Sequence, residues 1–61
     1  MTVQEFFDMV FTNEFHNIRL KSKETDKALI EFSNGVPDAY VNKKITGLAT
    51  DWDARIYILW I

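Results

Sequence analysis

The sequence predicts an α+β domain in which one N-terminal amphipathic helix packs on a small antiparallel sheet of about four strands. Three observations lead to this prediction. The chain has 61 residues, which is enough for a single domain over residues 1–61. Apolar residues recur at helical spacing near the N-terminus, and they alternate with polar residues further along. The resulting order is helix, hairpin, short helical turn and hairpin.

The helix is predicted to begin after Thr2. Thr2 and Glu5 have the spacing of a capping box, in which each side chain accepts the backbone N–H of the other residue. Asn13 is typical of a helix end, so the helix should stop near residues 12–13. The stripe that would face a sheet consists of Val3, Phe6, Phe7, Val10 and Phe11. A helix this short needs a sheet beneath it to be stable.

The first hairpin follows directly. Residues 15–21 alternate and place Ile18 and Leu20 on one face, and residues 27–33 form the second strand after a polar turn. Gly35 ends this hairpin, where we expect a positive φ that glycine tolerates.

The second half of the chain predicts a helical turn and another hairpin. Pro37 is typical of a first helical position, and the turn should end near Asn42. Residues 45–50 and 54–61 form the last two strands, joined by a turn around Trp52.

The final strand is apolar on both faces. One face holds Ile56, Ile58 and Trp60, and the other holds Tyr57, Leu59 and Ile61. A single helix covers one face only, so the face of Tyr57, Leu59 and Ile61 needs another cover. Three covers are open: residues 36–44 folded across the back of the sheet, a second copy of the chain, or a foreign protein.

These patterns predict a partner-binding surface. Trp52 stands in a turn between two aspartates, where a core tryptophan would be unusual, although the ring could also fold back over the sheet edge. Tryptophan is enriched among the residues that dominate binding energy. The predicted surface consists of Trp52, Tyr57, Leu59, Ile61, Leu29 and Leu48.

Catalytic chemistry is not predicted. The chain has no cysteine and two glycines, so it has neither a thiol nucleophile nor a glycine-rich phosphate loop. A serine triad would have to combine Ser22 or Ser33 with His16, which we expect instead at the end of the core face. We therefore predict no enzyme, no catalytic residue, no cofactor and no small-molecule substrate.

One set of side chains could bind a metal ion. His16 could combine with Glu14, or with Asp51 and Asp53, to offer nitrogen and oxygen ligands. The two aspartates more simply solvate the turn around Trp52. We expect an adventitious ion at most.

The charge pattern does not favour nucleic acid or a membrane. The net charge is −2, and Glu24, Asp26 and Glu31 interrupt the basic residues of the hairpin of residues 19–27. Those basic residues are Arg19, Lys21, Lys23 and Lys27. Glu5 and Asp8 disfavour a signal peptide, and no apolar run has the length of a membrane span. We expect a cytoplasmic protein.

Several short motifs carry a resemblance over nearly the whole chain. They are Thr2 to Phe7, Val36 to Val41, Lys44 to Thr46, and Ile56 to Ile58. With these the chain resembles small accessory proteins encoded by phages and mobile elements of Gram-positive bacteria. The resemblance implies a protein without catalytic signatures, and some small phage proteins inhibit CRISPR nucleases. Five lysines between Lys21 and Lys44 depart from the acidic members, and no functional residue is carried over.

We therefore expect a small, non-enzymatic protein-binding module, whose partner by the resemblance is a host defence (CRISPR) nuclease. One alternative is a structural homodimer that buries the back of the sheet. The other is a weak nucleic-acid binder that uses the hairpin of residues 19–27.

Overall fold

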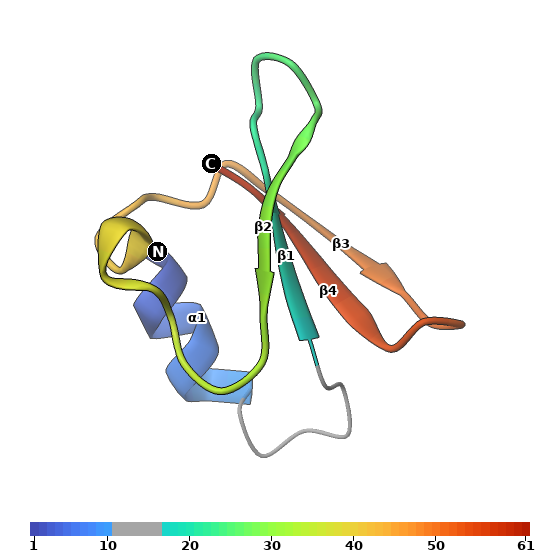
Figure 1. Cartoon of the computed structure of the whole chain (residues 1–61), viewed down its shortest axis with the longest axis horizontal. Helices are drawn as coiled ribbons and strands as arrows, with labels where there is room; N and C mark the ends of the chain where they lie inside the picture. Colours follow the sequence, from blue (N-terminus) through green and yellow to red (C-terminus); the bar gives the residue numbers. More distant parts are fainter. Residues whose placement is uncertain (11–16) are drawn as a thin grey trace.

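The computed structural model describes residues 1–10 and 17–61 of the chain (Figure 1). The elements are helix α1 (Val3–Val10), strands β1 (Asn17–Lys21) and β2 (Ala28–Phe32), the 3₁₀ turn η1 (Asp38–Tyr40), and strands β3 (Gly47–Asp51) and β4 (Ile56–Trp60). The described residues thus hold one helix and one four-stranded sheet, which confirms the α+β class. The predictions for Phe11, for the helix end at residues 12–13, and for Glu14, Phe15 and His16 lie outside the described residues.

The sheet has the strand order β2-β1-β4-β3. Strands β1 and β2 are antiparallel, as are β3 and β4, but β1 and β4 are parallel. The prediction of an antiparallel sheet is therefore wrong at its centre, and the sheet is mixed. The alternation of residues along a strand predicts which side chains share a face of that strand. It does not predict that β1 and β4 are neighbours, because the chain between them is long and passes by α1.

A capping box begins α1, as predicted. The backbone N–H of Thr2 donates to Glu5 Oε1 at 2.8 Å, and the N–H of Glu5 donates to Thr2 Oγ1 at 3.2 Å. The first of these hydrogen bonds holds the pKa of the Glu5 carboxyl below its ordinary value. The box satisfies backbone groups that would otherwise lack a partner at the helix N-terminus.

The connection between β2 and β3 lies on the same side of the sheet as α1. The Val3 N–H donates to the Lys43 carbonyl at 2.9 Å, and the Ile45 N–H donates to the Met1 carbonyl at 2.9 Å. The residues of the connection that pack against the core beneath α1 are Val36, Tyr40 and Ile45. Of the three covers left open for the face of Tyr57, Leu59 and Ile61, residues 36–44 do pack against the core that contains Leu59, but they do so on the same side of the sheet as α1.

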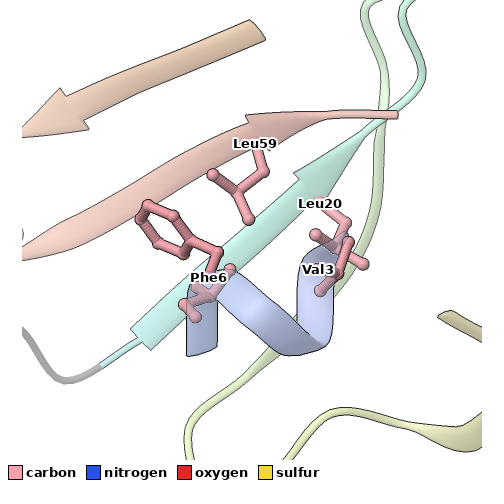
Figure 2. Packing of buried hydrophobic residues seen from close by; sticks show 5 residues of the cluster. Val3, Phe6, Leu20 and Leu59 are labelled. Carbon is pink, nitrogen blue, oxygen red and sulfur yellow. The ribbon is translucent and has the colours of Figure 1, made fainter. Parts of the chain in front are cut away.

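The core lies between α1 and the sheet (Figure 2). Its buried members are Val3, Phe6, Ile18, Leu20 and Leu59. Leu20 is the parallel partner of Leu59 and Ile18 that of Tyr57, so this face of β4 lies with the buried face of β1. The Phe6 ring packs edge-on against the Tyr57 ring at a centroid distance of 5.1 Å. We call this side of the sheet the helix face.

The opposite side of the sheet, which we call the far face, carries Arg19, Lys21, Ile58 and Trp60 on its central strands. The face of β4 that was predicted to need a separate cover is thus the one beneath α1. This prediction is wrong because the register between β1 and β4, rather than the composition of β4, decides which set of side chains meets the helix.

Two residues other than glycine adopt the left-handed backbone conformation. They are Asp26, with φ 58°, and Arg55, with φ 59°, one in the connection of each hairpin. No glycine in the described residues has a positive φ, so the prediction for Gly35 is wrong. Aspartate visits this region more readily than most residues because its short side chain bonds locally.

Candidate protein-interaction surface

The six residues predicted to bind a partner do not form one surface. Leu59 is 0% exposed in the core beneath α1, so its prediction as a partner contact is wrong. Tyr57 and Ile61 are half-buried against the same core. Leu29 is 48% exposed on β2 and Leu48 is 57% exposed on β3, which are the two opposite edges of the sheet. Leu48 and Trp52 both belong to the hairpin of β3 and β4, Leu48 in its first strand and Trp52 in its turn.

The far face of β1 and β2 carries a polar cluster in place of a protein cover. The Arg19 guanidinium contacts Glu31 Oε1 at 3.0 Å, and the Asn17 amide donates to Glu31 Oε2 at 2.9 Å. Arg19 and Glu31 are antiparallel partners, so the register of the hairpin places their side chains opposite each other.

A second polar cluster lies on the far face at the C-terminal ends of β1 and β4. The Trp60 indole Nε1–H donates to Asp26 Oδ1 at 2.7 Å, and the Lys21 ammonium lies 3.3 Å from the same oxygen. Lys21 also lies 5.3 Å from the centroid of the Trp60 ring. The indole N–H first, and the Lys21 ammonium second, hold the pKa of Asp26 below its ordinary value. Trp60 itself packs half-buried on the far face.

This cluster was missed from the sequence. The alternation along β1 and β4 assigns Lys21 and Trp60 each to one face of its own strand. Only the parallel register of the two strands makes them neighbours on the same face of the sheet. The left-handed φ of Asp26 then turns its side chain into reach of both.

The same ion pairs bear on nucleic-acid binding. Of the basic residues predicted to cluster on the first hairpin, Arg19 and Lys21 each contact a carboxylate. Paired charges release fewer counterions from a phosphate backbone than unpaired ones do. The positive potential of this hairpin is therefore weaker than its count of basic residues indicates.

The turn between β3 and β4 is held by one side chain. Asp51 Oδ1 accepts the backbone N–H of Asp53 and that of Ala54, both at 3.1 Å. Such a bond from an aspartate to the amides that follow it fixes a tight turn. Trp52 stands inside this turn and is 70% exposed, the largest exposed fraction among the large apolar side chains of the described residues. Most of the Trp52 side chain therefore faces solvent.

Ser22, one of the two serines weighed for catalysis, holds the turn of the first hairpin. Ser22 Oγ accepts the backbone N–H of Glu24 at 3.3 Å and that of Thr25 at 3.4 Å. Within residues 1–10 and 17–61, no three histidine or acidic side chains lie close enough together to hold a metal ion. His16 itself lies outside this part of the chain. In the same residues no helix has the length and apolarity needed to cross a membrane.

Comparison of the chain with protein families, with curated proteins and with solved structures finds no match.

Proposed function

We propose that this chain is a small, non-enzymatic protein-binding module that contacts its partner through Trp52. One observation carries the proposal: a large aromatic side chain is 70% exposed in a turn whose backbone is already held by Asp51. Tryptophan is among the residues most enriched at the energetic centres of interfaces. A turn that is ordered before binding loses little conformational entropy when the partner arrives.

The area of the indole supports a substantial contribution to binding. A tryptophan side chain buries about 150–250 Å² at about 25 cal/mol per Å². Covering the exposed part of Trp52 would therefore remove enough apolar area from water for about 3 kcal/mol, from which the costs of association are subtracted. Trp52 is not among the residues that pack in the core beneath α1.

The charges around the turn indicate which chemical groups a complementary partner would carry. Asp51 and Asp53 flank Trp52, and the chain has a net charge of −2. A complementary partner therefore offers an apolar pocket for an indole with basic groups at its rim. The resemblance to phage and mobile-element accessory proteins supports a host defence nuclease as the candidate partner, in the cytoplasm of the host cell.

The experiment compares three baits in a pull-down from host lysate: the wild type, Trp52→Ala, and Leu29→Ala as a matched control. Leu29 is an exposed apolar residue on the opposite edge of the sheet. We expect Trp52→Ala to lose the partner and Leu29→Ala to keep it. With the purified partner, Trp52→Ala should weaken binding about 30-fold or more, the loss typical of a residue worth about 2 kcal/mol.

A thermal unfolding scan of both variants is the folding control. Because Trp52 is mostly exposed, its removal should leave the melting temperature close to that of the wild type. A folded Trp52→Ala protein that retains every partner of the wild type would show that the turn is not the contact. Inhibition of a purified defence nuclease by the wild type, but not by Trp52→Ala, would identify the partner class.

A further inference from the structure

Strand β3 presents an unprotected edge. It is the last strand of the order β2-β1-β4-β3, and Figure 1 shows it at the side of the sheet away from α1. Among the described residues no strand pairs with its outer side. In an antiparallel pair every second residue directs its N–H and C=O away from its neighbour, so the outer side of β3 carries a row of backbone donors and acceptors.

The opposite edge of the sheet is protected by known devices. The pairing of β2 with β1 contains a register shift between Leu20 and Lys21, which interrupts a regular ladder. Lys27 immediately precedes β2. Bulges and charges of this kind discourage the addition of a further strand. Gly47–Asp51 contains no proline, and its single charged residue, Asp51, stands at its end.

We propose that the outer edge of β3 pairs with β3 of a second copy of this chain, antiparallel and about a two-fold axis at Ala49. The two sheets then form one continuous sheet with four strands from each copy. Ala49 lies opposite itself, and Leu48 lies opposite the second copy's Thr50. Gly47 lies opposite the second copy's Asp51.

Repulsion between like charges favours the antiparallel orientation over the parallel one. In the antiparallel register the two Asp51 carboxylates stand at opposite ends of the paired strands, about 14 Å apart at the rise of a β-strand. That separation exceeds the screening length of about 8 Å at physiological ionic strength. A parallel pairing in the same register would place the two carboxylates side by side. The position of Asp51 therefore selects the antiparallel orientation for a pair of β3 strands.

Symmetry also favours a second copy over an unrelated strand. A two-fold contact uses the same edge of both molecules, so it removes both unprotected edges at once and stops at two copies. The paired segment is short, which places this interface among the small and weak ones. The inference does not rest on the proposed function, because the paired segment Gly47–Asp51 does not include Trp52.

Sedimentation equilibrium tests the proposal on the full chain between about 10 μM and 1 mM, the range suited to a weak interface. We expect the mass to rise from one chain to two with concentration. A constant monomer would overturn the proposal. Assemblies of more than two copies would also overturn it, because a two-fold contact between β3 edges stops at two copies.

A charge exchange at the two-fold axis tests the register. Because Ala49 opposes itself, Ala49→Lys and Ala49→Glu should each lose the dimer when alone, and an equal mixture of the two should restore it. Leu29→Lys and Leu29→Glu, on the protected edge, are the matched controls and should dimerise like the wild type. Dimers of either Ala49 variant alone, or a mixture that stays monomeric although both variants are folded by circular dichroism, would overturn the register.

A measurement on the wild type covers the case in which the Ala49 variants do not fold. On dilution, the amide resonances of alternate residues in β3 should shift, because their N–H groups exchange a protein carbonyl for water, while those of β2 stay constant. Shifts confined to β2, or none in β3, would overturn the proposal. The Trp52→Ala variant should dimerise normally, which separates this test from that of the proposed function.

Discussion

Leu59→Ala is the substitution that best tests which face of β4 meets the helix. Leu59 is 0% exposed, and it lies on a central strand with β1 on one side and β3 on the other. Hydrogen bonds on both sides keep the backbone from moving into the space that the side chain leaves. Core Leu→Ala substitutions cost about 2–5 kcal/mol, and more where the site cannot collapse. We therefore expect a loss of about 3–5 kcal/mol in the free energy of unfolding.

This loss is large for so small a chain. At about 0.05–0.15 kcal/mol per residue, the total free energy of unfolding is about 3–9 kcal/mol. The variant should therefore be largely or partly unfolded at 25 °C. Urea titration followed by circular dichroism measures both proteins, and the midpoint of the variant should fall far below that of the wild type.

Leu48→Ala is the matched control for this prediction. Leu48 is the antiparallel partner of Leu59 on the helix face, but it lies on the edge strand and is 57% exposed. The same chemical change should therefore cost less than about 1 kcal/mol there. Equal losses at the two positions, or a Leu59→Ala protein as stable as the wild type, would refute the placement of Leu59 beneath α1.

Two further predictions concern the helix cap and the acid limb of stability. Thr2→Ala removes the acceptor of the Glu5 N–H and should lower the free energy of unfolding in urea by about 1 kcal/mol. The control Thr25→Ala, in an exposed turn, should lower it by less than about 0.5 kcal/mol. Equal losses for the two variants would contradict the cap. For Asp26, the folded-state pKa lies below the ordinary value, so its contribution to stability is complete above the unfolded pKa and is lost as pH falls through the folded pKa. The urea midpoint of the wild type should therefore fall on acidification below about pH 4, and that of Asp26→Asn should fall less over the same interval. Urea midpoints that fall in parallel with pH in the two proteins would contradict the contacts of Asp26 with Trp60 and Lys21.

Local patterns predicted local structure well. The capping box of Thr2 and Glu5 needs only residues that are three apart, and its two hydrogen bonds are present. The four strands fall within or one residue beyond their predicted ranges, and the helical turn after Pro37 is present as η1. These features depend on periodicity and on turn chemistry within a few residues, which a single sequence displays directly.

The candidate site was predicted less completely. Trp52 was singled out because a tryptophan between two aspartates is unusual, and its exposure agrees with that reasoning. Tyr57, Leu59 and Ile61 were assigned to the wrong environment. Their alternation correctly made them one face of β4, but alternation cannot say what a face contacts.

The sequence by itself determined the elements, their order and the two faces of each strand, because backbone periodicity and capping act over a few residues. Only the tertiary structure decided that β1 and β4 run parallel, and with it which face of β4 the helix covers. The same register brought Lys21 beside Trp60 and left β3 at the edge of the sheet. These outcomes depend on the contact between two segments almost forty residues apart, where packing and chain connection, rather than local preference, set the free energy.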